Sequence, residues 1–259
     1  MEMFSLFHDN SFQKEHDFEL FKNREIKAKS IFSIKEVDKN SAYEFVKKYH
    51  YLGNAKFFSQ QAFGLFYHDS MVGVATFSQP QGTATAKGWF GLTTSDKSIY
   101  ELSRLCLLPT LNGTNATSFL LGGAIKALKR QGVIKAIITL ADSSRHVGSI
   151  YQVCNFKYYG LTNAKSDFFC IDGTVNPRGA TKCKRGVWLP RTRKHRYCYL
   201  IDKTLNVLYQ EKEKPSTTET TKTECCGGTG FVYDKRFGDW FTCPKCSSKF
   251  RIVNKEELA

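Results

Sequence analysis

The chain has 259 residues, of which 41% are hydrophobic and 14% aromatic, enough for one substantial core with a small accessory domain. Lysine and arginine number 38 against 24 acidic residues, a formal net charge of +14. No run of about 18 apolar residues is present, and residues 1–16 lack the pattern of a secretory signal peptide. We therefore expect a cytoplasmic protein, whose nine cysteines serve core packing, metal binding or catalysis rather than disulfides.

The first predicted elements are a helix and a β-hairpin, after residues 1–35, which show no clear period and stay unassigned. The stretch IKEVDKNSAYEFVKKYH has apolar side chains at helical spacing, with Asn40 and Ser41 as its capping residues. AFGLFY and MVGVATF then have the composition of two strands joined by a short polar turn at 68–70. This pattern predicts a hairpin.

Residues 99–160 alternate strands and helices. IYELSRLCLLP is a β-rich run, LNGTNATS is a polar turn, and FLLGGAIKALKRQG has apolar residues at helical spacing. VIKAIITLA is an apolar run of strand length, and a polar turn then leads into a second helix within DSSRHVGSIYQVCNFKYYG. Because a strand that feeds a helix N-terminus commonly holds an anionic cofactor, this order indicates an enzyme. Cys106 and Cys154 lie in apolar runs and are predicted core residues.

Two closing strands are predicted at FFCID and YCYLI, separated by a basic stretch, and residues 173–201 carry charge of one sign. The stretch contains basic residues but no aspartate or glutamate, which points to a polyanionic partner. Trp188, Tyr197 and Tyr199 are interleaved, which favours nucleic acid over a solvated surface or an acidic protein partner. The predicted DNA-binding residues are Lys184, Arg185, Arg191, Arg193, Lys194 and Arg196.

The stretch EKEKPSTTETTKTE is charged and nearly free of apolar residues, which predicts a flexible linker. In the tail that follows, Cys243 and Cys246 have the two-residue spacing of a zinc knuckle. With Cys225 and Cys226 upstream, the four thiols predict a zinc-ribbon-like domain holding structural Zn²⁺. Because a ribbon normally repeats the two-residue spacing and these upstream thiols are adjacent, a redox-active tail without metal is the alternative.

From residue 36 to 201 the order of elements resembles the GCN5-related N-acetyltransferase superfamily, and VGSIYQVCNFKYYG resembles its closing signature. The resemblance implies an α/β fold of the α+β kind, with a mixed sheet. The expected domains are an unassigned segment at 1–35, an acetyltransferase-like DNA modification domain at 36–210, the linker at 211–224 and the zinc-ribbon-like domain at 225–259.

The glycine-rich acyl-CoA turn of that superfamily is not present here in its usual form. Polar residues take its place, and they can present backbone N–H groups to an anion at the start of a helix. These candidate cofactor-binding residues are Asn112, Gly113, Thr114, Asn115 and Ser118, the last of which adds a hydroxyl. The donor of the transferred group therefore stays open between acyl-CoA and a glycine-derived compound.

A set of blocks resembles the phage Mom family of DNA modification enzymes more closely. In chain order the blocks are KKYHYLG, FGLF, MVGVATF, YELSRLCLLP, SFLLGGAIKALKRQG, TLADSSRHVGSIYQVCNFKYYG and RTRKHRYCYLI. The resemblance implies a transferase that attaches a carbamoylmethyl group to N6 of adenine in double-stranded phage DNA, protecting it from host restriction. The alternatives are an acyl-CoA-dependent N-acetyltransferase of a small molecule or protein, and a non-catalytic zinc-ribbon DNA-binding protein.

Two parts of the sequence contribute the first candidate catalytic residues. His50 and Tyr51 lie at the end of the predicted first helix, from which side chains can enter a cleft. The resemblance implies a catalytic His50, whereas an ordinary packed histidine is the alternative. Arg104 lies within a strand, where a charge is costly unless it is paired. It is either a clamp for an anion or donor carbonyl, or the ion-pair partner of Glu101 or Asp142.

Two further candidates follow the second buried strand. Asp142 comes directly after this strand, at the edge where open α/β sheets bind ligands. The alternative is capping of the next helix, which Ser143 or Ser144 could also provide. Tyr151 matches the acetyltransferase tyrosine that commonly protonates the leaving group, with helix packing as the alternative. The predicted catalytic residues are His50, Tyr51, Arg104, Asp142 and Tyr151.

Overall fold

The computed structural model describes residues 27–51, 57–80, 82, 84–143, 145–170, 175–176, 185–216, 240–242, 249–251 and 253–254. By its internal contacts the chain divides into two units. Unit 1 is drawn from Met1–Thr139, Ile150–Lys157 and Tyr197–Glu211, and unit 2 from Leu140–Ser149, Tyr158–Arg196 and Lys212–Ala259. The domain boundaries expected from the sequence stay a prediction.

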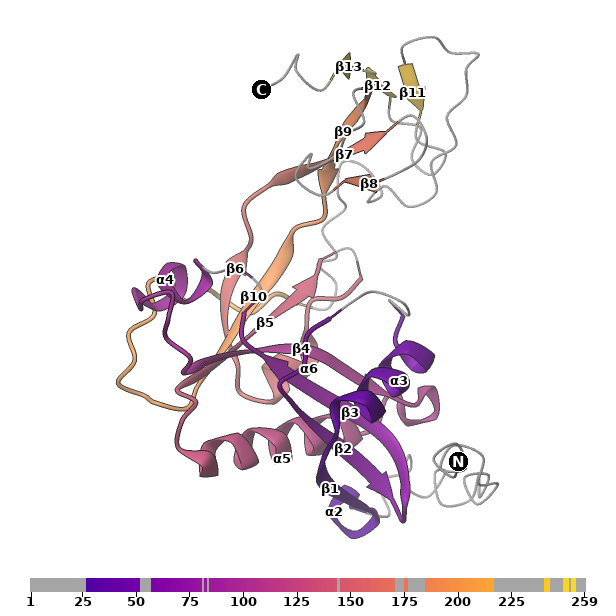
Figure 1. Ribbon diagram of the computed structural model, residues 1–259, viewed down its shortest axis with the longest axis vertical. Coiled ribbons are helices and arrows are strands. Elements are labelled where there is room, and N and C mark those ends of the chain that lie inside the picture. The colour runs from indigo at the N-terminus through magenta and orange to yellow at the C-terminus, as the bar shows by residue number, and fades with distance from the viewer. Residues whose placement is uncertain are drawn as a thin grey trace. The chain divides into compact units, whose positions relative to one another are not determined.

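Helices and strands alternate along much of the described chain (Figure 1). The helices are α2 (Ala28–Ile31), α3 (Lys39–Tyr49), α4 (Thr85–Phe90), α5 (Ala116–Gln131) and α6 (Ser149–Val153), with a 3₁₀ turn η3 (Pro109–Leu111). The strands are β1 (Phe32–Val37), β2 (Gln61–Tyr67), β3 (Ser70–Ser78), β4 (Ile99–Leu107), β5 (Ala136–Asp142), β6 (Lys157–Leu161), β7 (Lys165–Cys170), β8 (Val175–Asn176), β9 (Arg185–Arg191), β10 (Lys194–Leu200), β11 (Trp240–Thr242), β12 (Lys249–Arg251) and β13 (Val253–Asn254).

The largest sheet is mixed and has the strand order β1-β2-β3-β4-β5-β10-β6. β1 to β4 pair antiparallel with their neighbours, whereas β4 and β5 run parallel. That parallel pairing covers Ile99–Glu101 of β4 and Ala136–Ile138 of β5, although β4 itself continues to Leu107. A mixed sheet interspersed with helices confirms the predicted α/β fold class. Smaller sheets join β11 to β12 and β13-β9-β7-β8.

The predicted hairpin is present, and a strand that the sequence pattern did not reveal extends it. β2 and β3 pair antiparallel, with Gln61 opposite Phe77 and Tyr67 opposite Ser70. β1 pairs with the other edge of β2, so that Phe32 also lies opposite Tyr67. The start of the stretch predicted as a helix, IKEV, therefore belongs to a strand, and that part of the prediction is wrong.

Helix α3 begins after this strand and is capped by Asp38. The Asp38 carboxylate accepts the backbone N–H groups of Asn40 at 2.9 Å and Ser41 at 3.0 Å. Hydrogen bonds from the hydroxyl and the N–H of Ser41 lower the pKa of Asp38. Asn40 and Ser41, the predicted caps, are instead residues of the helix, because the acidic side chain before them satisfies the first N–H groups.

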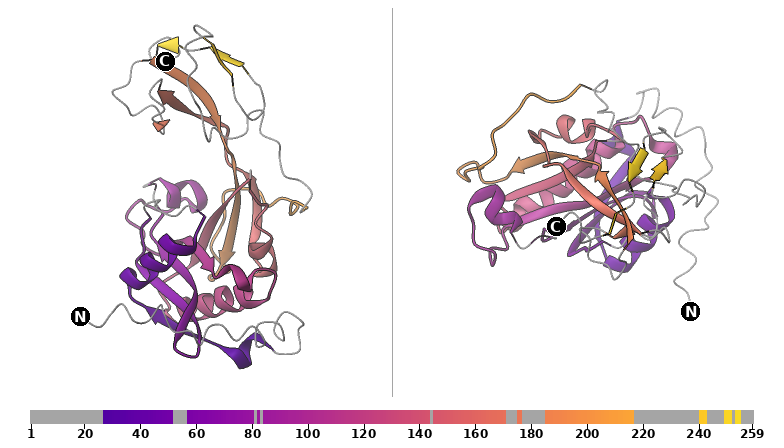
Figure 2. Two further views of the ribbon diagram at one scale, coloured as in Figure 1. Left: turned by 90° about the vertical axis from the view of Figure 1, so that its right-hand side faces the viewer. Right: turned by 90° about the horizontal axis from the view of Figure 1, so that it is seen from above.

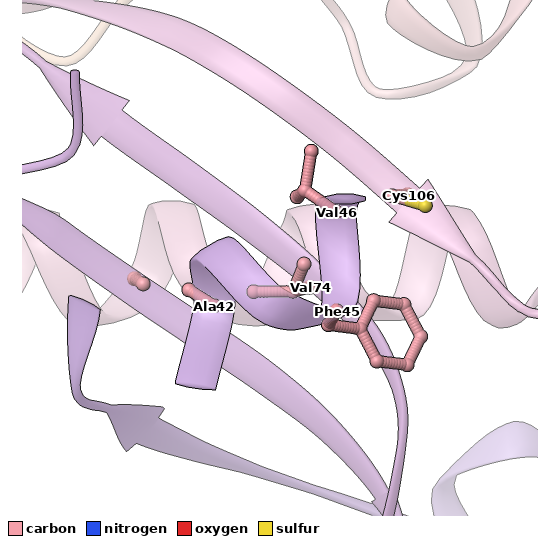
Figure 3. Packing of buried hydrophobic residues seen from close by; sticks show 6 residues of the cluster. Ala42, Phe45, Val46, Val74 and Cys106 are labelled. Carbon is pink, nitrogen blue, oxygen red and sulfur yellow. The ribbon is translucent and has the colours of Figure 1, made fainter. Parts of the chain in front are cut away.

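α3 and α5 cover opposite faces of the sheet (Figures 1 and 3). On the α3 face the core cluster consists of Ala42, Phe45, Val46, Ala62, Val74 and Cys106, which confirms the predicted core position of Cys106 (Figure 3). On the other face, Gly123 of α5 lies against Ile34, and a Cβ at this glycine would overlap the isoleucine side chain. Because strand residues alternate between faces, Thr76 of β3 points to the same side as Val74.

Helix α5 confirms the helix predicted from FLLGGAIKALKRQG and begins one turn earlier, at Ala116. It ends at Gly132, whose φ of 73° is left-handed and whose N–H bonds the Lys129 carbonyl at 3.2 Å. This is a common way to end a helix, because glycine adopts that conformation without strain. Within the described residues, no helix is long and apolar enough to cross a membrane.

In unit 2, β7 and β9 form an antiparallel ribbon (Figure 2). Phe168 lies opposite Trp188 in the register, and their rings are 5.2 Å apart. Phe168 and Leu189 are buried, so this ribbon contributes to an apolar core of its own. Tyr197 is also fully buried, within unit 1, and its hydroxyl accepts a hydrogen bond from Gln152. Tyr197 is therefore a core residue, and the prediction that its ring is available to nucleic acid is wrong.

Candidate active site

A bulge in β4 directs Arg104 to the α3 face of the sheet. Thr76 of β3 lies opposite Arg104, whereas the next residue of β3, Phe77, lies opposite Leu102. Ser103 is therefore an extra residue on β4. In a regular strand Arg104 would share the face of Leu102, two positions away, but the bulge places it beside Thr76 instead. Bulges commonly re-aim a side chain next to active sites.

Arg104 is half-buried and is held on two sides. Its Nη1 donates to the Ser103 carbonyl at 2.7 Å, and its guanidinium carbon lies 5.1 Å from the centroid of the Phe57 ring. Burial lowers the pKa of the guanidinium, while Tyr51 and Glu101 nearby raise it. The buried Nε finds no hydrogen-bond partner among the described residues. An arginine held in this way keeps its charge and has an N–H group left for a ligand.

Other polar side chains line the same two strands next to Arg104. Thr76 is fully buried, and its Oγ1 has no hydrogen-bond partner among the residues that the structure describes. One step further along, the hydroxyls of Ser78 and Ser103 lie 2.8 Å apart. Buried polar groups are costly when they are left unpaired, so an orphaned hydroxyl here calls for an explanation.

His50 and Tyr51 stand at the C-terminal end of α3, as predicted. His50 is the residue that ends the helix, and its backbone N–H bonds the Val46 carbonyl at 2.9 Å. The rings of His50 and Tyr51 stack with centroids 4.3 Å apart. Tyr51 is 55% exposed, which is unusual for a large aromatic side chain. The end of the helix thus presents an accessible aromatic surface backed by a histidine.

Tyr151 is buried on α6 and is hydrogen-bonded to Thr139 of β5. Its ring packs against Tyr197 and Phe156, at centroid distances of 5.4 and 5.7 Å. Burial raises the pKa of the Tyr151 phenol, the Thr139 bond lowers it, and Tyr51 raises it further. The net shift is upward, so the phenol is neutral near pH 7 and can donate a proton.

Tyr51 links the predicted catalytic residues of unit 1. It lies close enough to influence the pKa of both Arg104 and Tyr151, and it stacks on His50. These residues come from the end of α3, the bulged strand β4 and helix α6, which are far apart in the sequence. Together they combine a cation, a proton donor, a histidine and an exposed aromatic ring, and we call them the candidate active site.

Asp142 belongs to unit 2 and is the last residue of β5. Its carbonyl accepts the backbone N–H groups of Arg145 at 3.0 Å and His146 at 3.1 Å, which form the turn after the strand. Helix α6 begins well after this turn, so Asp142 does not cap it. Ser143 does not cap it either, because its hydroxyl donates to the Arg193 carbonyl at 2.8 Å. Ser144 lies outside the described residues.

The predicted cofactor turn precedes α5 in unit 1. Gly113 has a left-handed φ of 80°, which bends the chain towards the helix. The Thr114 hydroxyl donates to the Leu111 carbonyl at 2.6 Å and accepts the N–H of Ala116 at 3.3 Å, whereas Asn115 makes no side-chain cap. Asn112 and Asn115 are exposed at this turn.

The N-terminus of α5 also contacts α6. The Ser118 hydroxyl donates to the Asn115 carbonyl at 2.8 Å. The Ser118 carbonyl accepts a weak hydrogen bond from the half-buried Cys154 thiol, with sulfur and oxygen 4.0 Å apart. Burial raises the pKa of this thiol to about 11, so it stays protonated near pH 7. The turn therefore lies at the end of α6, the helix that carries Tyr151.

Several predicted DNA-binding residues are engaged with unit 2 itself. Arg193 Nε donates to the Thr162 carbonyl and Arg196 Nη2 to the Leu161 carbonyl, each at 2.7 Å. Arg191 lies 3.7 Å from the Asp167 carboxylate. Arg193 is exposed, while Arg191, Lys194 and Arg196 are partly exposed. Arg185 belongs to β9, but its side chain, like Lys184 as a whole, lies outside what the structure describes.

The four predicted zinc ligands, Cys225, Cys226, Cys243 and Cys246, lie outside the described residues, so the zinc site stays a prediction. Among the described residues there is no group of three or more His, Cys, Asp or Glu side chains that could hold a metal ion. Cys170 and Cys198 are buried.

A comparison with protein families decides the classification of the chain. The model of the Mom protein family matches residues 31–217, which is well over half of the sequence. The chain belongs to the Mom protein family. The match includes every described residue of the candidate active site and the cofactor turn, and it ends before the four tail cysteines. Among curated proteins, none matches the chain.

Solved structures similar to the chain include N-acetyltransferases. The ribosomal-protein-S18-alanine N-acetyltransferase from Escherichia coli is 12% identical over 70% of this chain and 100% of its own, with a TM-score of 0.42. An N-acetyltransferase from Staphylococcus aureus Mu50 is 15% identical over 66% of this chain and 98% of its own, with a TM-score of 0.41. An acetyltransferase of the GNAT family from Streptococcus pneumoniae is 14% identical over 65% of this chain and 99% of its own, with a TM-score of 0.41.

Three residues that the sequence analysis did not single out lie next to the candidate catalytic residues. Phe57 lies under the guanidinium of Arg104, and Thr139 bonds the phenol of Tyr151. Thr76 lies opposite Arg104 in the sheet register. One signal was available in the sequence: a threonine inside the apolar run MVGVATF is unusual, although threonine is also a common strand residue.

Proposed function

We propose that the chain is a DNA-modifying transferase that attaches a carbamoylmethyl group to N6 of adenine in double-stranded phage DNA. The observation that carries the proposal is the convergence of Tyr51, Arg104 and Tyr151 in a chain of the Mom family. The resulting modified base would protect phage DNA from host restriction nucleases. The reaction would take place in the cytoplasm of the infected cell.

The acceptor atom sets the first requirement. The lone pair on N6 of adenine is delocalised into the ring, so the amine is a poor nucleophile and its proton must be removed as it reacts. A base inside a duplex is also out of reach, so it has to be extruded from the stack. In the proposal the exposed ring of Tyr51 supports the extruded base by stacking, and His50 accepts the N6 proton.

The transfer step keeps atoms and charge in balance. A bond forms between N6 and the methylene carbon of the carbamoylmethyl group, while the bond from that carbon to the leaving group breaks. N6 loses one proton, which goes to His50, and the leaving group gains one proton from Tyr151. The neutral, buried phenol of Tyr151 suits this role because its raised pKa keeps the proton in place until the leaving group takes it.

Arg104 would stabilise the oxygen of the transferred group. Its guanidinium is fixed by the Ser103 carbonyl and the Phe57 ring, so little reorganisation is needed when a ligand binds. Its unpartnered Nε–H is a charged donor, and charge-assisted hydrogen bonds are about twice as strong as neutral ones.

The donor would bind at the turn before α5. The first N–H groups of a helix have no intrahelical partner, and here those of Ala116 and Phe119 are bonded to Thr114 and Asn115. The N–H groups of Thr117 and Ser118 are left to bind an anionic part of the donor. The transfer step above needs a donor with a leaving group on its methylene carbon, which a glycine-derived compound can supply and acyl-CoA, which reacts at its carbonyl carbon, cannot. A simple acyl donor would leave an amide on N6, whereas the carbamoylmethyl product has an sp³ carbon there.

The basic residues of unit 2 would bring DNA to the enzyme. Arg191, Arg193, Lys194 and Arg196 lie on β9, β10 and the turn between these strands. Contacts of such residues with phosphates give affinity but little sequence preference. We also propose that Asp142, in the same unit, is a catalytic residue. It is the last residue of β5, and open α/β sheets bind ligands at this end of their strands.

Mass spectrometry of bacterial DNA tests the proposal. The chain is expressed in bacteria, the DNA is digested to nucleosides, and deoxyadenosine is examined for an added carbamoylmethyl mass. We expect the wild-type chain to give the heavier nucleoside. We expect Arg104→Ala and Asp142→Ala to reduce it by about 100-fold or more, and Arg130→Ala to leave it unchanged. Arg130 is a matched control because it is an exposed arginine on α5.

The alternatives predict other results. An N-acetyltransferase of a small molecule or protein would leave deoxyadenosine unmodified, and it would bind acetyl-CoA tightly without any need for the basic residues of unit 2. Unmodified deoxyadenosine from cells that contain folded, DNA-binding protein would overturn the proposed function and favour the non-catalytic DNA-binding protein.

A further inference from the structure

The pair formed by Thr76 and Arg104 leaves two buried hydrogen-bond donors side by side. Thr76 is fully buried, and neither its Oγ1 nor the Arg104 Nε has a hydrogen-bond partner among the described residues. The two residues are direct cross-strand partners on β3 and β4. The Cβ atoms of such partners lie about 4.5–5.5 Å apart and point to the same face.

Burial of either group without a hydrogen-bond partner lowers the free energy of unfolding. A buried donor without an acceptor costs about 1–3 kcal/mol, and more when it is charged. The next pair on the same face of these strands, Val74 opposite Cys106, is apolar and part of the core cluster (Figure 3). An apolar pair would therefore also fit the sheet at the next position. We expect the polar pair to lower stability, which is typical of a binding position rather than a packing position.

We propose that Thr76 is a binding residue of the active site, and that its hydroxyl and the Arg104 Nε–H together hold the carbonyl oxygen of the transferred group. The inference rests on the proposed function. The chemistry of the two donors selects the ligand atom, because Nε–H can only donate and carries positive charge. An oxygen with partial negative charge and two lone pairs accepts both bonds at once, as an amide or carboxyl carbonyl does.

The bulge at Ser103 explains how the pair arises. If Ser103 is left out of the count, the side chains of β4 alternate regularly between the two faces of the sheet. Leu102 then lies on one face and Arg104 on the other. The extra residue supplies the carbonyl that holds Nη1 and a hydroxyl for Ser78. Nη1 is thus tied back, and Nε remains as the donor nearest the backbone of the strand.

The test compares Thr76→Val with Thr76→Ser in the nucleoside assay, at matched expression and over a time course after induction. Valine keeps the shape of threonine but has no hydroxyl, and serine keeps the hydroxyl. We expect the rate of adenine modification to fall about 100-fold in Thr76→Val and to stay close to wild type in Thr76→Ser. Thr93→Val, the same change at an exposed position in unit 1, is the control that should modify DNA normally.

Thermal unfolding provides the readout that a packing role would not produce. We expect the midpoint of Thr76→Val to be unchanged or raised by about 2–4 °C, because an unpaired buried hydroxyl has been removed. Lower activity with equal or higher stability supports a binding role. If the valine variant does not fold, Thr76→Ala takes its place, with the same comparison to serine.

A double variant tests whether the two donors hold one atom. The rate of adenine modification in Thr76→Val combined with Arg104→Gln should be only slightly lower than in Arg104→Gln alone. The reason is that loss of the arginine already disrupts binding of the carbonyl oxygen, so loss of the threonine hydroxyl has little further effect. Wild-type activity in Thr76→Val, or failure of Thr76→Ser to restore activity, would overturn the inference while leaving the proposed function intact. If the wild-type chain itself leaves adenine unmodified, the proposed function falls and the inference with it.

Discussion

Two neighbouring pairs on the same two strands differ in chemistry. Val74 and Cys106 pack in the core under α3, and two residues further along β3, Thr76 and Arg104 present polar atoms to the same face. Burial raises the pKa of the Cys106 thiol to about 12, as expected in apolar surroundings, whereas it lowers the pKa of the Arg104 guanidinium. The sheet face thus changes from core to site within two residues, at the position of the bulge.

A second contrast concerns the arginines. Arg104 in unit 1 keeps an unpartnered Nε within the described structure, and Arg193 in unit 2 is exposed and bonded through Nε to a carbonyl. The first arrangement suits a small ligand that accepts a hydrogen bond from this buried Nε–H. The second orients an exposed cation, which is what contact with a phosphate backbone requires.

The largest expected effect comes from making the apolar pair polar. Val74→Asp places an unpaired carboxylate in the core cluster, and we expect a loss of roughly 4 kcal/mol in the free energy of unfolding. Urea denaturation followed by circular dichroism measures it. Because Val74 and Thr76 share a strand and a face, Thr76→Asp is the matched comparison and should cost clearly less, since Thr76 lies opposite the cation Arg104. Equal losses at the two positions would show that they do not differ as core and site.

Tyr151→Phe tests a buried polar group that does have a partner. The rate of adenine modification should fall about 100-fold, because the phenylalanine ring cannot protonate the leaving group. Packing of the ring against Tyr197 should be retained, so stability near pH 7 should change little. The nucleoside assay at low expression measures the rate, and wild-type modification in this variant would remove Tyr151 from the mechanism.

The same variant also has a predicted pH dependence. The pKa of Tyr151 in the folded chain is raised above the usual 10.0, because burial favours the neutral phenol. Its neutral form is present in both states below pH 10, and above that the unfolded chain loses the proton first. Wild-type stability should therefore fall more steeply than that of Tyr151→Phe as the pH rises above 10. Denaturation curves from pH 8 to 11 give the free energy of unfolding of both proteins. An equal fall with pH in the two proteins would contradict the burial of the Tyr151 phenol.

The smallest expected effect concerns the exposed arginines. Replacement of Arg191, Arg193 and Lys194 by glutamine should weaken binding to a double-stranded oligonucleotide about tenfold and reduce the salt slope by about one unit per lost phosphate contact. Fluorescence anisotropy at several salt concentrations measures both. A matched control removes the same charge from exposed residues of α5, with Lys126, Lys129 and Arg130 replaced by glutamine. Equal weakening by both sets would show only a net-charge effect.

The sequence alone determined the alternation of elements in the centre of the chain and the family. Apolar runs and turn residues were sufficient for the hairpin, for β4, α5 and β5, and for the core position of Cys106. These features depend on local periodicity, which is visible in a single sequence. β1 was missed because IKEV has two adjacent charged residues and no alternation of apolar and polar side chains, and its strand conformation depends on pairing with β2.

The tertiary structure decided which residues share a site. Sequence indicated Tyr51, Arg104 and Tyr151 separately, through family blocks, but only folding brings a helix end, a strand and a later helix together. It also decided the direction of Arg104, because alternation in IYELSRLCLLP would place it with Leu102 and the extra residue Ser103 reverses this. A bulge depends on register with the neighbouring strand. For that reason Thr76 became visible only beside its partner.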